Sequence, residues 1–531
     1  MKRYFFLIGL GLIYVGGFSQ ETQTLYSPIN NMFFEDLLKE MSENPANYEY
    51  VPIGNYTASN LFYRYETGSL KQGGIPESIQ RFGIETKGIY RDSANRLFFG
   101  DLSIEKSYYD DLKWNLSYQL PENGLMSDPH YFGVSKGAKW NNQDFDISGG
   151  MIQPLGKKWS FLIKANYHLF NKYRTDFDPR PKITFNDLEF LGGFSYLINN
   201  KHHIKLNGVY GSTDVSNDVD FSNNDKNIPY NYDIYIKWIA GYGSLVSPFK
   251  SNTQRKFTQT GYNLGYSYIS EKNKFFADFS YREKEQITYR SASVENEDDP
   301  AEYFATYSPQ TMDFSLIGLH TINERNLLKL SMNTHIFSGD NFITSKGGKS
   351  YSAEEKNINF NLALLNQDSN GITNIDTGIK GEWLQVKQQD ILAATISDIT
   401  NLNLGAYFLK SYKVKENLRI NPFGEISFSY NYSSDFINGS QDYLSNISEN
   451  DYAGLALKAF YDEVIYPDVE LLSTNRINIS TGVSVNFLSA GNLNSLFRLE
   501  AGIKKPLEEL DNFEESKPHR LYGSTSLTIY Y

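Results

Sequence analysis

The 531-residue sequence contains no cysteine and, past its first twenty residues, no long apolar run. The missing cysteine excludes disulfide frameworks, thiolate metal sites and a lipid-bearing cysteine behind a signal peptide. A membrane-spanning helix needs a run of about 18 apolar residues, so the sequence excludes a bundle of membrane helices. A mean hydropathy of -0.47 and a charged fraction of 21% agree with this exclusion.

Positive charge is also in deficit. The chain has 50 Lys and Arg against 62 Asp and Glu, which gives a net charge of -12 and an isoelectric point near 5.2. A protein that binds the phosphate backbone needs clustered Lys and Arg. We therefore expect no nucleic-acid partner.

Aromatic residues, in contrast, are abundant, with 40 Tyr and 36 Phe. From about residue 82 onward they take part in a period-two alternation of apolar and polar residues, the pattern of β-strands with two unlike faces. The clearest example is the last segment, where one face carries Leu521, Gly523, Thr525, Leu527, Ile529 and Tyr531. Such segments run for about 10 to 14 residues, longer than the usual strand of a soluble sheet and suited to a tilted crossing of a bilayer.

The polar faces of these segments contain charged residues in mid-strand. Arg498 and Glu500, for example, lie within the sequence 497–501. Each would cost a few kcal/mol against lipid, but both suit a hydrated lumen. The alternation therefore predicts an all-β protein, a transmembrane antiparallel β-barrel of the outer membrane with lipid outside and water inside.

Short turns and long polar loops follow one another along the chain, as they do in outer-membrane barrels. Reading back from Tyr531, we predict about 18 strands, an even number, of which the first three cover 82–91, 96–106 and 112–120. The apolar stretch 452–461 would break the alternation of turns and loops if it crossed the membrane. We therefore expect it in a structured extracellular loop.

The N-terminus has the three parts of a signal peptide. Lys2 and Arg3 precede an apolar stretch over 4–15, and small residues at positions 17 and 19 suit a cleavage site. We predict a signal peptide over 1–19, a periplasmic or lumenal segment over 20–80, and the barrel over 81–531.

Within that segment the sequence predicts an amphipathic helix over 32–42. Phe33, Leu37 and Met41 fall on one face, and Pro45 ends the helix. A helix before the first strand suggests a gate that packs in the lumen or across its periplasmic mouth. The alternative is a flexible periplasmic tail.

Taken together, the signal peptide, the helical segment and the aromatic strands resemble the uncharacterised outer-membrane β-barrel proteins of Bacteroidota. In that resemblance Leu527, Ile529 and Tyr531 are similar to the terminal signal that the barrel-assembly machinery reads, which implies that machinery and outer-membrane lipid as partners. The triplet Asn44-Pro45-Ala46 is similar to one in the N-terminal hatch of fatty-acid-transporter barrels. TonB-dependent receptors resemble the chain in their strands, but they carry a plug of well over a hundred residues before the barrel. The segment expected before the barrel here covers only 20–80, so the chain does not match a receptor of that class.

Sequence motifs for chemistry are missing. Gly348-Lys349-Ser350 resembles the end of a phosphate-binding loop, but Ile343 stands where its first glycine should be. The seven histidines are scattered, and the acidic segments 214–225 and 295–299 lack the ligand spacing of a calcium loop. We expect no enzymatic activity, no metal and no cofactor.

Two functions remain open at this point. The first is a channel or receptor in the cell outer membrane that takes up a small solute, with the N-terminal helix as its gate. The second is a structural or accessory barrel subunit of a surface complex, which would bind a partner such as another outer-membrane protein through its long loops.

Overall fold

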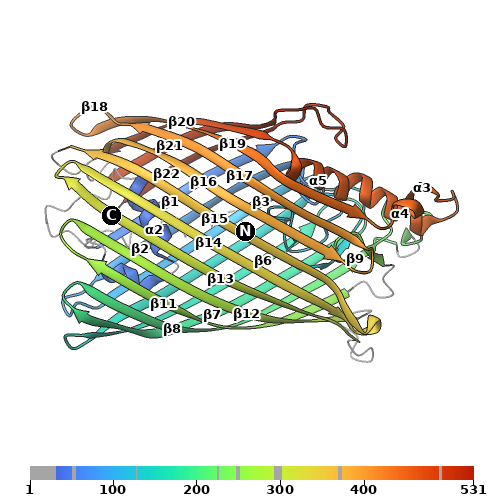
Figure 1. Cartoon of the computed structure of the whole chain (residues 1–531), viewed down its shortest axis with the longest axis horizontal. Helices are drawn as coiled ribbons and strands as arrows, with labels where there is room; N and C mark the ends of the chain where they lie inside the picture. Colours follow the sequence, from blue (N-terminus) through green and yellow to red (C-terminus); the bar gives the residue numbers. More distant parts are fainter. Residues whose placement is uncertain are drawn as a thin grey trace.

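The computed structural model of the chain describes residues 32–42, 44–50, 55–126, 128–223, 226–231, 233–246, 252–291, 302–368, 373–488 and 493–530. The signal peptide expected over 1–19 lies outside these residues. One antiparallel sheet dominates the fold, and it closes on itself because its last strand, β22, pairs with its first, β1. The result is a barrel whose two ends differ, with short turns at one and larger loops at the other (Figure 1).

The barrel strands pair almost wholly with their neighbours in the sequence. They are β1 (Tyr56–Thr67), β2 (Ser78–Arg91), β3 (Leu97–Asp110), β5 (Trp140–Leu155), β6 (Trp159–Arg174), β7 (Arg180–Asn199), β8 (His202–Asp220), β11 (Asn252–Ile269), β12 (Asn273–Ser291), β13 (Glu302–Asn323), β14 (Asn326–Ile343), β15 (Gly348–Gln367), β16 (Thr373–Asp390), β17 (Thr395–Lys410), β18 (Tyr412–Lys415), β19 (Leu418–Asn438), β20 (Arg476–Leu488), β21 (Asn494–Pro506) and β22 (Arg520–Tyr530).

This sheet has 19 strands by hydrogen bonding, but β17 and β18 are separated by Ser411 alone and pair with the same neighbour, β19. Together they form one continuous position in the barrel wall. We call each such position a stave, and the chain crosses the wall in eighteen staves. The predicted fold class and strand number are thereby confirmed.

The predicted number of strands is right because two errors in the strand assignment offset each other. The barrel begins at β1, so the boundary expected at residue 81 is too late, and the segment 112–120 expected as a strand is not one. Asp111 and Trp114 have φ of 49° and 56°, which take the chain out of the extended path. Leu112 and Leu116 are fully buried inside the barrel, so their alternation reflects packing in a lumenal loop.

Apolar side chains alternate outward along the staves. Leu61, Leu206 and Leu499 are each at least half exposed in the isolated chain, with exposed fractions of 57%, 58% and 50%. Many aromatic and aliphatic residues share this outer surface. Such a belt is stable only against lipid.

Most staves are longer than the 10 to 14 residues expected. The strand β13 has 22 residues and β19 has 21. A bilayer needs only about 9 to 11 residues of a tilted strand. The hairpins therefore continue beyond the membrane, and β14 and β15 are joined by a tight connection with a 3-10 turn, η5 (Thr344–Lys346).

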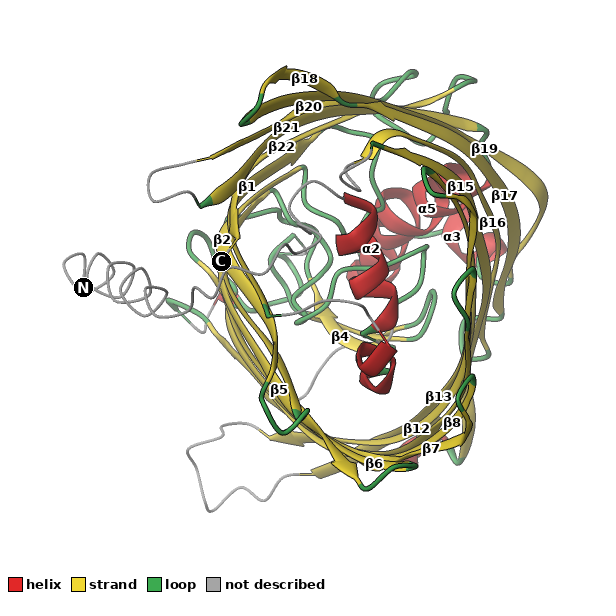
Figure 2. Ribbon diagram, turned by 90° about the vertical axis from the view of Figure 1, so that its left-hand side faces the viewer, coloured by secondary structure: helices red, strands yellow, loops and turns green. Residues whose placement is uncertain are grey.

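The lumen is occupied from both ends (Figure 2). At the end with short turns lie the helix α2 (Met32–Met41) and the 3-10 helix η3 (Pro45–Tyr50). At the other end the loops after β3 and β8 fold inward and form a small sheet of β4 (His130–Gly133), β9 (Lys237–Ala240) and β10 (Leu245–Val246).

The loop between β19 and β20 is helical. It contains α3 (Gln441–Ser445), α4 (Tyr452–Phe460), the π-helix η6 (Tyr461–Ile465) and α5 (Tyr466–Ser473), and it reaches past the barrel rim (Figure 1). The stretch 452–461 is therefore part of a structured loop, as predicted. No helix in the described part of the chain is both long and apolar enough to cross a membrane.

Candidate functional site: a polar chamber between two plugs

The helix α2 packs its apolar face against the inner wall near the periplasmic end. Leu37, Leu38 and Met41 are buried and belong to one apolar cluster with Leu162, a residue that points inward from β6. Burying each such side chain contributes about 1.5–3 kcal/mol. The helix predicted over 32–42 is thus present, although the side chain of Phe33 lies outside the described residues.

Polar contacts hold the segment after the helix. The Nδ2 atoms of Asn44 and Asn47 donate to the two carboxylate oxygens of Asp278 on β12, at 2.5 and 2.8 Å. Lys205 on β8 donates to Oδ1 of Asn47 and, at 2.6 Å, to the hydroxyl of Ser267. We call Asn44, Asn47, Asp278 and Lys205 the latch.

Besides the latch, two further contacts hold the N-terminal segment against the barrel wall. Glu40 accepts from the Nζ of Lys329 on β14 at 2.8 Å, and this ion pair is largely shielded from solvent. The hydroxyl of Tyr50 lies 2.8 Å from Nδ1 of His203. A buried hydrogen bond to a charged group contributes more than one between neutral groups, so this segment is held by more than its apolar face.

The opposite plug is built from the inward loops and is apolar at its centre. Phe132 and Trp238 are fully buried, and their rings meet edge to face at 4.6 Å between centroids. Arg255 on β11 pairs with Asp128 at 2.9 Å, with almost no solvent contact at either side chain. Burial lowers the pKa of His130 to about 4, so this histidine is neutral at pH 7.

The helical loop between β19 and β20 packs against this outer plug. Nε1 of Trp114 donates to Glu463 at 2.8 Å, and the backbone N–H of Gly73 donates to Asp468 at 2.7 Å. Burial raises the pKa of Asp468 to about 7, although the Gly73 N–H and the charge of Lys71 act to lower it.

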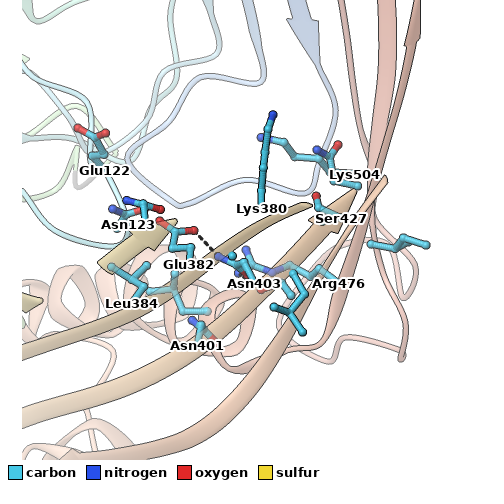
Figure 3. A pocket seen from close by; sticks show the side chains of 18 of the residues that line it. Glu122, Asn123, Lys380, Glu382, Leu384, Asn401, Asn403, Ser427, Arg476 and Lys504 are labelled. Carbon is cyan, nitrogen blue, oxygen red and sulfur yellow. Dashed lines mark hydrogen bonds between the residues drawn. The ribbon is translucent and has the colours of Figure 1, made fainter. Parts of the chain in front are cut away.

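Between the two plugs lies a chamber of about 710 Å³. Glu40 of α2 lines it from one end and the loop residues Glu122 and Asn123 from the other. Its side wall is made by residues of β14 to β22. Figure 3 shows the labelled side chains that β16, β17, β19, β20 and β21 contribute. A volume of this size matches a small organic solute.

The chamber wall is polar, and its side chains stand in two rows set by the strand register. The first row runs Glu382, Asn403, Ser429, Arg476 across β16, β17, β19 and β20. The second, one inward position away, runs Lys380, Gly405, Ser427, Asn478, Lys504, Arg520 and ends on β22. The short side chains in the middle of both rows leave room for a solute against the wall.

Several charges in the wall are already paired. Lys380 donates to Glu425 at 2.7 Å, and Arg520 donates to Glu66 at 2.5 Å. Glu382 accepts from Asn403, as Figure 3 shows, and from Asn357. Fixed carboxylates, amides and cations of this kind offer hydrogen bonds to a polar solute without first having to be ordered.

Of the sequence-predicted residues, only the helix comes near the chamber. Leu527 and Ile529 share the outward face of β22 with Leu521, which is exposed, while Tyr531 lies outside the described residues. The predicted assembly signal thus stays a prediction. Among the described residues no three His, Asp or Glu side chains gather as possible metal ligands.

Sequence reasoning did not find the chamber. The inward face of each strand could be recognised, but the two rows join residues more than a hundred positions apart, such as Lys380 and Arg520. One usable signal was the inward charge near strand ends, at Arg476 and Lys504. Which loops fold inward, and hence where the cavity is left, could not be read from local patterns.

A closed antiparallel barrel of eighteen crossings, with an apolar belt and a polar interior, is an outer-membrane β-barrel of a Gram-negative bacterium. The chain belongs to the DUF6850 family, a family of unknown function whose model matches residues 45–531. No curated protein sequence matches it. Its expected origin in Bacteroidota stays a prediction.

Solved outer-membrane barrels are similar to the chain at low scores. BauA, the ferric preacinetobactin receptor from Acinetobacter baumannii, is 9% identical with a TM-score of 0.39, over 89% of this chain and 80% of that one. The ferric citrate transporter FecA is 11% identical with a TM-score of 0.37, over 90% and 79%. A Pseudomonas aeruginosa FadL homologue is 11% identical with a TM-score of 0.32, over 92% of both chains. Identities and TM-scores this low do not indicate which solute this chain would bind.

Proposed function

We propose that the protein is an uptake channel or receptor for a small polar solute, with the N-terminal segment as its periplasmic gate. The observation that carries this proposal is the chamber between α2 and the inward loops, which is lined by polar and charged side chains. A barrel that served only to display its loops would have no need of a preformed, charged cavity at its centre. The accessory-subunit function has no comparable observation in its favour.

The two plugs suggest two gates of different strength. The outer plug has a continuous apolar core, whereas the N-terminal plug combines a short apolar face with the latch. Removing Asp278 leaves both latch amides without their acceptor, and a short helix without tertiary support is marginal in water. We therefore expect the latch to control access to the chamber from the periplasm.

The gate is tested by cysteine labelling. A single cysteine at Asn403 reports on the chamber, since the chain has no other. In oriented proteoliposomes, a membrane-impermeant maleimide on the periplasmic side should label it slowly in the otherwise unchanged protein and much faster with Asp278→Ala. Asp313→Ala is the matched control, because Asp313 also faces inward but bonds His335 and Ser280 on the wall. Equal labelling in all three proteins contradicts the gate.

Transport is tested separately by uptake of labelled glucose into proteoliposomes. One variant carries Asp278→Ala, a second replaces residues 113–137 with a short Gly-Ser turn, and a third combines both changes. Uptake should be highest in the combined variant, because each change opens one end. If all three remain heat-modifiable barrels and none admits solute, the uptake function is wrong and the accessory role takes its place.

A further inference from the structure

The chamber carries an excess of positive charge at one end. Arg476 begins β20, Lys504 is near the end of β21, and Lys71 lies in the loop between β1 and β2. All three line the chamber, and in the described part of the chain none of them forms an ion pair. Arg520 stands beside Lys504 in the register but is compensated by Glu66.

The guanidinium of Arg476 is the most informative of the three. Its Nε is buried and has no hydrogen-bond partner in the described structure. Its Nη2 has only a long contact, 3.4 Å, to the hydroxyl of Ser429. A buried donor without an acceptor is unfavourable, and more so when it is charged, so such a group marks a place where an acceptor is expected to bind.

Lys504 and Lys71 also lack an ion pair in the described part of the chain. The charge of Glu66 acts on Lys504 against those of Arg520 and Arg476, and its ammonium lies 5.7 Å from the ring centre of Tyr522, while Lys71 donates to the carbonyl of Ile75 at 2.9 Å. Burial, together with the cations Lys113 and Arg520, lowers the pKa of Lys71 to about 8 against the opposing effect of Asp111 and Asp468. An anion at this end would stabilise the charged form of all three residues.

We propose that Arg476, Lys504 and Lys71 form an anion subsite of the chamber, which takes the carboxylate or phosphate group of a small polar solute. The inference rests on the proposed uptake function and names the class of its solute. The planar guanidinium suits a two-oxygen acceptor, and the two ammonium groups add charge from other directions. The amides and hydroxyls in the middle of the rows, Asn403, Ser427, Ser429 and Asn478, then meet the uncharged polar part.

Two other buried charge clusters in the described part of the chain lie outside the positive end of the chamber. Arg255 pairs with Asp128 and donates to the carbonyl of His130 inside the apolar outer plug, and the ion pair of Glu40 with Lys329 lies on the side of the latch. Glu122 and Glu382 also line the chamber, and the charge of Glu382 acts on Arg476 along the first row. The three cations would orient a solute with its anionic group toward β20 and β21.

The test compares probes that share a sugar ring and differ in charge. Titration calorimetry on the full mature chain in detergent would use glucuronate, glucose 6-phosphate and glucose. At low salt, glucuronate or glucose 6-phosphate should bind at least about tenfold more tightly than glucose, as expected for charge-assisted hydrogen bonds. Which of the two binds better distinguishes a carboxylate from a phosphate as the natural group.

Variants then locate the binding. Arg476→Gln with Lys504→Gln should erase the preference for the anion, while Lys164→Gln, a change on the inner wall of β6 outside the chamber, should keep it. Heat-modifiability confirms that each variant folds. If the preference is missing in the unchanged protein, or survives the double substitution, the subsite is overturned, whereas glucose uptake in the proteoliposomes would still support the channel. If no probe binds or crosses in any variant, the uptake function falls with it.

Discussion

At the scale of single residues, the inner and outer faces of each strand make opposite demands on a side chain. Leu330 on β14 is outward and exposed, and Asn333 on the same strand lines the chamber. The alternation in the sequence predicted these faces correctly. It could not show that Ser331, also inward, is buried under α2 and lies 3.3 Å from Glu40, because that contact joins residues 291 positions apart.

The contrast between the two faces gives a stability prediction. Leu330→Arg should lower the free energy of unfolding by about 2–4 kcal/mol if the residue is near the bilayer midplane. Asn333→Arg should change it little, because the side chain enters a hydrated chamber. Urea unfolding in phospholipid vesicles measures both. Equal losses at the two positions would mean that Asn333 does not face water.

The buried carboxylate of Asp468 makes the stability of the helical loop between β19 and β20 depend on pH. The unfolded reference pKa of Asp468 is 3.8 and the folded value is about 7, so between these values the folded loop keeps a proton that the unfolded loop has released. The free energy of unfolding of the helical loop therefore falls as pH rises from about 4 to 7 and levels off above. Hydrogen exchange of α5 should accelerate correspondingly between pH 4 and 7.

Asp468→Asn isolates this effect, because the amide oxygen still accepts from Gly73 but no longer titrates. The variant should exchange with a flatter pH profile, after correction for the intrinsic rate. Asp462→Asn, on the exposed side of the same loop, should behave like the unchanged protein. A flat profile in the unchanged protein would show that Asp468 is ionised throughout.

At the scale of elements, the sequence predicted the strands and the helix in which apolar residues recur at regular spacing. Seventeen of the eighteen staves and the helix α2 have clear alternation or a clear apolar face. The strand β1 was missed because its inward side carries Tyr56, Ala58 and Phe62, apolar residues that contact other side chains in the lumen, so the two faces look alike. The segment 112–120 was mistaken for a strand for the converse reason, since an extended loop packed on one side also alternates.

The corrected position of β1 changes how the N-terminal segment can be removed. Deleting residues 20–50 should leave a heat-modifiable barrel, because β1 keeps its pairing with β2 and β22. Deleting residues 20–60 removes the first part of β1 and with it much of the closing seam. That protein should fail to reach the outer membrane in normal amounts, as fractionation and heat-modifiability would show. If both deletions assemble equally, β1 is not needed for closure.

At the scale of the whole molecule, closure depends on the last strand meeting the first. We expect deletion of Tyr531 to lower outer-membrane abundance without changing solute binding by the protein that does assemble, since Leu527 and Ile529 already face outward and the chamber is remote. Quantitative immunoblotting of outer-membrane fractions and calorimetry on purified protein separate the two effects. Normal abundance without Tyr531 would show that the terminal aromatic residue is not part of an assembly signal.

The latch and the chamber occupy different sectors of one continuous wall. The latch takes its wall partners from β8 and β12, the solute-facing rows stand on β16 to β22, and the two sectors meet at β14. Members of the family could therefore exchange the rows, and with them the preferred solute, while retaining the same closure. Chimaeras joined between β15 and β16 would take both rows, with Arg476 and Lys504, from their C-terminal part, and the gate and Lys71 from their N-terminal part.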